Sequence, residues 1–264
     1  MQRSAVRPSP IFLGLLALTV GAGFLAALGG ETAARAGVFL LVLGGWAVSL
    51  CLHEFGHALV AYRGGDWSVQ SKGYLTLNPA RYTDPVLSLL LPILFLAIGG
   101  IPLPGGAVWI NHGSLRSRGI ESWVSLAGPL TNLVIGIVLA VVVGTAGPSD
   151  AAMVTDYFTG DTTANALWAG LAFLALLQLS AFILNILPVP GLDGWGAIQP
   201  FLSYEARAFG AKARQWAPLI LFAVLIGVPG ASGVFWDVVE SLFGAVGGNE
   251  VAAAIGNELF FFWR

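Results

Sequence analysis

Long apolar stretches dominate this sequence and constrain its fold more than any other feature. Only 10% of the 264 residues are charged and the mean hydropathy is +0.81, whereas a soluble protein carries about 25% charged residues. A helix needs about 20 apolar residues to cross a bilayer. Four stretches are that long: Ile11–Gly29, Ala36–Tyr62, Ser122–Gly144 and Ala164–Leu187. The sequence therefore predicts an all-α polytopic membrane protein.

Shorter apolar segments extend this prediction to about five to six transmembrane helices. Pro85–Ile101 and Trp216–Val228 are short or interrupted, and Val234–Phe262 reads as an amphipathic tail at the membrane surface. We expect the first apolar stretch to remain as an uncleaved helix. We further expect one membrane-embedded domain over residues 1–264, with its core at about 36–195 and a C-terminal helix and tail at about 214–264.

Basic residues near the ends of the apolar stretches predict the orientation, because they remain on the cytoplasmic side. They precede the first stretch, follow the second, precede the third and follow the fourth: Arg3, Arg7, Arg63, Lys72, Arg81, Arg116, Arg118, Arg207, Lys212 and Arg214. Only Arg35 lies between the first two stretches. The connection 145–163 has no Lys or Arg and contains three aspartates. We therefore expect a cytoplasmic N-terminus in a cell membrane, with the acidic connection outside.

The Pro85–Ile101 segment conflicts with this orientation if it crosses the membrane fully, because Arg116 and Arg118 would then lie outside. A segment that enters and returns removes the conflict. Glycines and prolines at 99–106 supply the necessary breaks, and residues 107–110 have the composition of a short strand. We predict a re-entrant segment with a short β element near 85–115.

Two classes of protein are excluded by composition. The formal net charge is −2 and no Lys/Arg cluster is present, so the chain is not a strongly basic nucleic-acid-binding protein. Cys51 is the only cysteine, so neither an intrachain disulfide framework nor a cysteine zinc ribbon can form.

A metal-binding pattern lies within the second apolar stretch. His53, Glu54 and His57 form H-E-x-x-H. On a helix, positions i and i+4 share a face about 6 Å apart along the axis, so both imidazoles can reach one tetrahedral ion. Glu54 projects roughly 100° away and can act as a base without being a ligand. The alternative is a pair of core histidines satisfied by neighbouring backbone or a carboxylate.

Two histidines leave a zinc ion short of a protein ligand. Asp193 is the favoured third ligand, because it follows a long apolar helix that Pro188 and Pro190 interrupt. Its alternative role is to stabilise a turn at the helix end. We expect Asp66 and Asp84 to form surface pairs in the basic loop, and His112 to be an interfacial polar residue rather than a third imidazole ligand.

Three motifs in order resemble the site-2 protease family of intramembrane metalloproteases, in its compact bacterial form without PDZ or CBS domains. They are His53-Glu54-Phe55-Gly56-His57, Ala127-Gly128-Pro129-Leu130-Thr131-Asn132, and the Asn185–Gly194 segment. The resemblance covers most of Val48–Gly194. Trp195 departs from the family pattern, where a small or polar residue is more familiar, and we expect it to shape the substrate entrance.

The resemblance implies one Zn²⁺ held by His53, His57 and Asp193, with Glu54 as the catalytic base. It also implies that Asn185 binds substrate or the developing oxyanion, although a buried Asn can instead cap broken backbone. Asn132 belongs to the second motif, and its alternative role is an interhelical hydrogen bond.

The expected activity is hydrolysis of a peptide bond in or beside the transmembrane segment of a single-span membrane protein. By analogy with the family, such a substrate could be an anti-sigma factor. The rival hypothesis is a non-proteolytic zinc-binding scaffold, pseudoprotease or transporter. A transporter would more typically show inverted repeats, which the sequence lacks, and a pseudoprotease has no need of Glu54.

Overall fold

The computed structural model describes residues 6–81, 108–159 and 165–263, and these are mostly helical with no β-strand among them. The predicted all-α class is confirmed. The α-helices are α1 (Pro10–Leu28), α2 (Glu31–Gly64), α3 (Ser68–Ser71), α5 (Arg118–Ala146), α6 (Asp150–Thr159), α7 (Ala166–Ile186), α8 (Asp193–Ile198), α9 (Tyr204–Ala213), α10 (Ala217–Gly227), α11 (Ala231–Ala245) and α12 (Glu250–Phe260).

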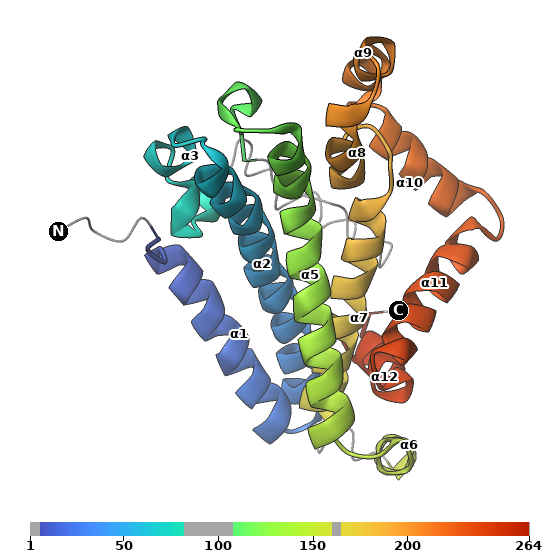
Figure 1. Cartoon of the computed structure of the whole chain (residues 1–264). Helices are drawn as coiled ribbons and strands as arrows, with labels where there is room; N and C mark the ends of the chain where they lie inside the picture. Colours follow the sequence, from blue (N-terminus) through green and yellow to red (C-terminus); the bar gives the residue numbers. More distant parts are fainter. Residues whose placement is uncertain (1–5, 82–107, 160–164, 264) are drawn as a thin grey trace.

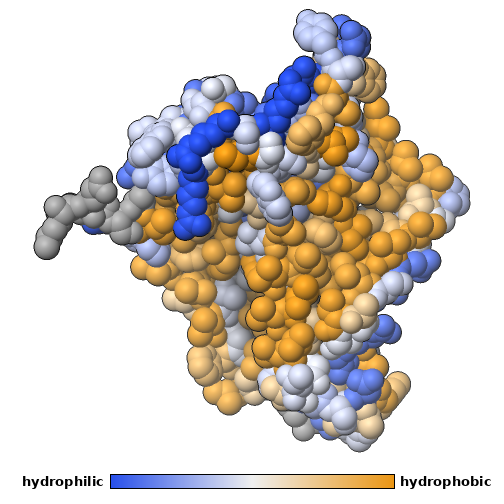
Figure 2. All heavy atoms as spheres, in the orientation of Figure 1, coloured by the Kyte–Doolittle hydropathy of each residue, from blue (hydrophilic) through white to orange (hydrophobic). Residues whose placement is uncertain are grey.

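Four of these helices, α1, α2, α5 and α7, are long and apolar enough to cross a membrane. A fifth span is possible if α9 and α10, which meet at a bend of 64°, are counted together. With that pair counted, the described residues contain five spans, the lower end of the predicted five to six transmembrane helices. Figure 2 shows a broad apolar surface between polar residues at the two ends of the molecule, as a membrane-embedded protein requires.

Helices α2, α5 and α7 form the centre of the bundle, with α1 against α2 and α12 against α7 (Figure 1). Small residues allow close approach, as is typical between membrane helices. A Cβ added to Gly37 of α2 would lie 2.4 Å from the backbone nitrogen of Ala26 in α1, and one added to Gly136 of α5 would lie 2.6 Å from the Leu179 side chain in α7.

The end of α2 and the start of α5 lie together at one end of the bundle. Arg116 donates its backbone N–H to the carbonyl of Gly64 over 3.1 Å, and Figure 1 shows both helix ends at the top of the molecule, near the end of α7. The chain therefore leaves α2 and enters α5 on the same side, as the charge pattern predicted. Residues 82–107 lie outside the described residues, so a re-entrant segment there remains a prediction.

Two local expectations need correction. The predicted strand at 107–110 is not found over its described residues, 108–110, where the N–H of Val108 donates to Glu54 and the carbonyl of Trp109 accepts from Lys72. The predicted surface tail is two helices, and the second packs into the bundle. Gly256 of α12 lies so close to the backbone of Ala169 in α7 that a Cβ would be 2.1 Å from its carbonyl oxygen.

Candidate metal centre

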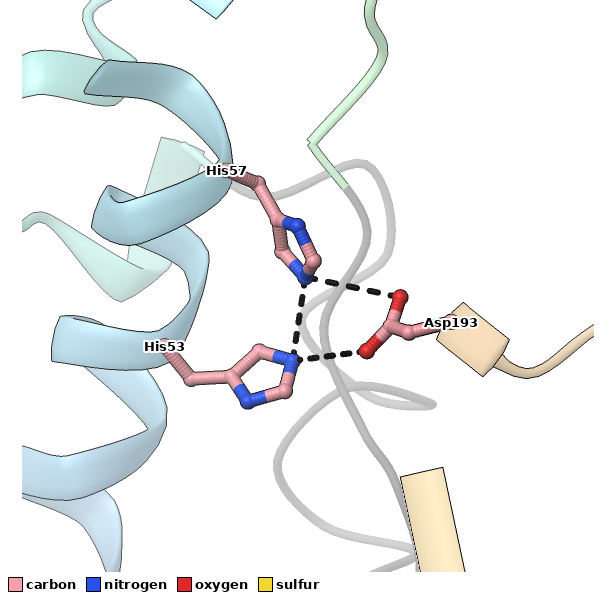
Figure 3. A group of neighbouring side chains, drawn as sticks. All are labelled: His53, His57 and Asp193. Atoms are coloured by element: carbon pink, nitrogen blue, oxygen red, sulfur yellow. Dashed lines mark hydrogen bonds and ion pairs between the residues drawn. The ribbon is translucent and has the colours of Figure 1, made fainter. Parts of the chain in front are cut away.

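His53, His57 and Asp193 come together at the end of the bundle where α2 and α7 finish (Figure 3). The two Nε2 atoms lie 3.1 Å apart. Asp193 at the start of α8 places Oδ2 3.2 Å from the Nε2 of His53 and Oδ1 3.5 Å from the Nε2 of His57. The three side chains predicted as ligands thus point at one another, although Asp193 is far from the two histidines in the sequence.

These distances fit a tetrahedral zinc ion. Zinc binds histidine nitrogen and carboxylate oxygen at about 2.0–2.1 Å, which puts neighbouring ligand atoms roughly 3.3 Å apart. Among the described residues, no fourth His, Cys, Asp or Glu joins the group. Three protein ligands with one open position are typical of catalytic rather than structural zinc.

The outer nitrogens of both imidazoles have partners that favour ligation. The Nδ1 of His53 is 2.6 Å from the Oδ1 of Asn132, and the Nδ1 of His57 is 2.7 Å from the carbonyl oxygen of Val124. A hydrogen bond from Nδ1–H leaves Nε2 unprotonated and able to bind metal. Asn132 therefore contacts the predicted ligand His53 directly.

The loop before α8 directs Asp193 toward the histidines. Gly191 has a φ of +98°, which other residues rarely adopt. A Cβ on Gly194 would lie 2.1 Å from the carbonyl oxygen of Ile186, so the loop turns tightly against the end of α7.

Glu54 lies beside the three side chains and is only 3% exposed. Its Oε2 accepts a hydrogen bond from the backbone N–H of Val108 over 3.1 Å. Both residues line a cavity of about 530 Å³ that also reaches His53, His57 and Asp193. Glu54 thus faces the space that a substrate and water would occupy.

The chain that follows residue 107 is fixed to the segment that comes directly after α2. Lys72 donates to the carbonyl of Trp109 over 3.1 Å and lies 3.9 Å from the centre of its ring. Asp66 accepts from the N–H of Asn111 over 2.7 Å. The expectation of a surface pair for Asp66 was wrong, because its side chain is buried and accepts a hydrogen bond from the backbone of Asn111. Asp84 lies outside the described residues.

The remaining predicted residues are at the cavity or beside it. Asn185 lines the cavity, and its Nδ2 donates to the carbonyl of Ala181 in its own helix over 3.0 Å. His112 also lines the cavity but pairs with Glu121 at 2.9 Å instead of joining the three predicted ligands.

Two residues that contribute to the site were not predicted from the sequence. Gly128 of the second motif packs against the imidazoles of His53 and His57. Gln178, a buried amide in an apolar helix, accepts a hydrogen bond from Asn132. The presence of an amide within a membrane helix was the available signal for Gln178.

Comparison with known proteins agrees with this geometry. Residues 38–228 match the sequence pattern of Peptidase family M50, the site-2 protease family. The chain belongs to this family. It is 48% identical over 265 residues to a Mycobacterium tuberculosis (strain H37Rv) protein named "Putative zinc metalloprotease Rip2", covering 99% of this chain and 96% of that protein.

More distant relatives extend the similarity. The Rip2 protein of Mycolicibacterium smegmatis is 44% identical, over 99% of this chain and 96% of its own length. YwhC of Bacillus subtilis, which carries the same zinc metalloprotease designation, is 33% identical over 199 residues, 74% of this chain and 83% of that protein. No solved structure matches the chain.

Family membership and the site together define the class of protein. It is a zinc metalloprotease, and its His53, His57 and Asp193 can bind the ion. Its apolar helices and bacterial relatives indicate a bacterial multi-pass membrane protein. Proteases of this family act on membrane proteins within the bilayer.

Proposed function

We propose that this protein is an intramembrane endopeptidase that hydrolyses a peptide bond in or next to the transmembrane segment of a single-span membrane protein. The observation that carries the proposal is the group of His53, His57 and Asp193 beside buried Glu54, all facing one cavity in an apolar helix bundle. Ionisable groups within membrane helices are expensive and mark functional sites.

We assign His53, His57 and Asp193 as the zinc ligands and Glu54 as the catalytic base. Bound zinc supplies a Lewis acid that polarises the scissile carbonyl and allows water to attack near neutral pH. Glu54 takes the proton of the attacking water and delivers it to the leaving amine. The hydrogen bond from Val108 supports this role, since it fixes the Glu54 carboxylate at the cavity without making it a ligand.

We assign supporting roles to the two asparagines. Asn132 keeps the proton of His53 on Nδ1, which leaves Nε2 for the metal. Asn185 is placed to contact substrate, because it lines the cavity one loop before Asp193. We expect its amide to turn from its own helix toward the substrate carbonyl on binding.

We propose a cytoplasmic N-terminus and a site near the cytoplasmic face. Except for Arg35 near the start of α2, the described Lys and Arg residues near the ends of α2, α5 and α7 occur at the end of the bundle that holds the site, and such residues favour the cytoplasmic side. A substrate held by one span would meet the site there. Anti-sigma factors are the example of such a substrate that the family suggests.

The test combines metal analysis with cleavage of a single-span substrate by the detergent-purified protein. Wild type should bind about one zinc ion and cleave the substrate. Glu54→Gln should keep zinc and lose cleavage, whereas Asp193→Ala should lose both. Glu240→Gln, which neutralises an exposed carboxylate on α11, is the matched control and should behave as wild type. Cleavage by Glu54→Gln at the wild-type rate would contradict the assignment of the base.

A further inference from the structure

Gln178 is a buried polar residue in the otherwise apolar middle of α7. Its side chain is fully enclosed, with 0% exposure. Its Oε1 accepts a hydrogen bond from the Nδ2 of Asn132 over 3.1 Å. Its Nε2 is buried with no hydrogen-bond partner among the described residues. A buried amide with an unsatisfied donor is unfavourable, so packing alone does not account for a glutamine at this position.

The hydrogen bonds of Gln178 lead to the metal centre. Gln178 of α7 binds the amide of Asn132 in α5, and the Oδ1 of that amide lies 2.6 Å from the Nδ1 of His53 in α2. All three side chains are buried. A continuous set of polar contacts therefore crosses the three central helices and ends on an imidazole.

The two histidines differ in how their outer nitrogens are held. His57 faces the backbone carbonyl of Val124, which can only accept a hydrogen bond. His53 faces a side-chain amide, which can present either its oxygen or its NH₂ group. If the Asn132 amide turned over, its NH₂ would face Nδ1 and favour the tautomer with the proton on Nε2. That tautomer has no lone pair on Nε2 for the metal.

We propose that Gln178 is a positioning residue that fixes the orientation of Asn132 and, through it, the metal-binding tautomer of His53. In the orientation that the structure shows, the Oε1 of Gln178 accepts from the NH₂ of Asn132, which leaves the Oδ1 of Asn132 toward His53. This inference rests on the proposed role of His53 as a zinc ligand. The reaction thus depends on a residue that contacts neither metal nor substrate.

The first test measures the zinc dissociation constant by chelator competition in detergent. Gln178→Met has a similar length and only a weak acceptor in its thioether sulfur, and we expect zinc binding about 10- to 100-fold weaker. Gln178→Glu keeps an acceptor oxygen in either protonation state and should remain close to wild type. Ser180→Ala is the matched control, because Ser180 is equally buried in α7 and its hydroxyl donates to the carbonyl of Leu177 in its own helix.

A second variant shows whether Gln178 acts by orienting Asn132 or only by packing within the helix bundle. In Asn132→Asp, both carboxylate oxygens accept, so His53 meets an acceptor whichever way the side chain turns. Adding Gln178→Met to Asn132→Asp should then weaken zinc binding little further. The loss in this pair should be much smaller than the loss in the wild-type background, which is a coupling that a double-mutant cycle measures. Equal losses in both backgrounds would overturn the proposal.

The tautomer can also be observed directly in the zinc-free protein. The chain has only three histidines, so ¹⁵N labelling of histidine gives few imidazole signals to assign. In wild type we expect the proton of neutral His53 on Nδ1, and in Gln178→Met a shift toward Nε2. An unchanged tautomer, or zinc binding at wild-type strength in Gln178→Met, would refute the role of Gln178. Zinc binding and tautomer are measured without a substrate, so failure of the proposed cleavage reaction is recognised separately.

Discussion

Gly128 of α5 packs directly against the Nε2 of His57, the nitrogen assigned above to the metal. A Cβ added to Gly128 would lie 2.3 Å from the Nε2 of His57, and it would also lie 2.5 Å from the Nε2 of His53. No real Cβ sits so close to another heavy atom. The absence of a side chain at this position therefore leaves the space in which the two ligand atoms meet.

Gly128→Ala should therefore weaken zinc binding. The added methyl group forces the imidazoles apart, and overpacking of this kind is unfavourable by roughly 1–3 kcal/mol. That range corresponds to a dissociation constant higher by about 5- to 150-fold. Chelator competition measures it. Gly119→Ala, an exposed position in the same helix with only a distant neighbour, is the control. Wild-type zinc binding by Gly128→Ala would show that the imidazoles can move aside.

The main features of the fold were predictable because each depends on local sequence. Helices α1, α2, α5 and α7 follow from apolar length. The pairing of His53 with His57 follows from helical spacing, and the position of Asp193 follows from the prolines that interrupt the chain after α7. Local patterns of this kind need no knowledge of which helices are neighbours.

The residues that were missed depend on contacts between helices. Gln178 and Gly128 gain their meaning only when α5 lies between α2 and α7 with one particular rotation. Asp66 looked like a surface residue because its neighbours are basic, but its partner Asn111 is 45 positions away. Helix rotation and such distant pairings have no signature in a single sequence.

Asp66 should give the protein an acid-sensitive contribution to stability. Burial opposes its ionisation, but hydrogen bonds from Ser68 and Asn111 outweigh this and hold the pKa of Asp66 below its usual range. A lowered folded-state pKa stabilises the fold above the unfolded value of about 3.9 and loses this effect as the pH falls through the folded value. Wild type should therefore lose stability in acid through this group.

Asp66→Asn isolates that contribution. At neutral pH we expect it to lower the free energy of unfolding by about 1–3 kcal/mol, since buried donors lose their charged acceptor. The difference from wild type should shrink as the pH falls below about 4. Denaturant unfolding in detergent at several pH values measures both effects. Asp237→Asn changes an exposed carboxylate and serves as control. A difference that stays constant with pH would contradict the assigned titration.

Gly256→Ala should loosen the contact between α12 and α7. Its Cβ would lie 2.1 Å from the carbonyl oxygen of Ala169 and 2.8 Å from the Cβ of Phe173, so α12 must shift. We expect a loss of about 1–3 kcal/mol in the free energy of unfolding. Gly233→Ala in α11, where nothing lies within 4 Å, is the control.

Zinc binding should change little in Gly256→Ala. Ala169 is 16 positions before Asn185 on α7, which is roughly 24 Å along the helix axis. The same unfolding and chelator measurements therefore separate stability from metal binding. A strong loss of zinc in this variant would mean that α12 supports the metal centre as well as the bundle.

Gly210→Ala should disturb the site through Trp195. A Cβ on Gly210 of α9 would lie 2.3 Å from Cζ2 of the Trp195 indole, which stands two positions after Asp193 at the edge of the cavity. The indole must move, and α8 moves with it, so we expect kcat/KM for a single-span substrate to fall on the order of tenfold. Trp195→Phe in the Gly210→Ala background makes room for the methyl group and should restore much of the activity. Gly227→Ala in α10, with no atom within 4 Å, should cleave as wild type does. If the double variant is no more active than Gly210→Ala, the loss arises in α9 rather than at the indole.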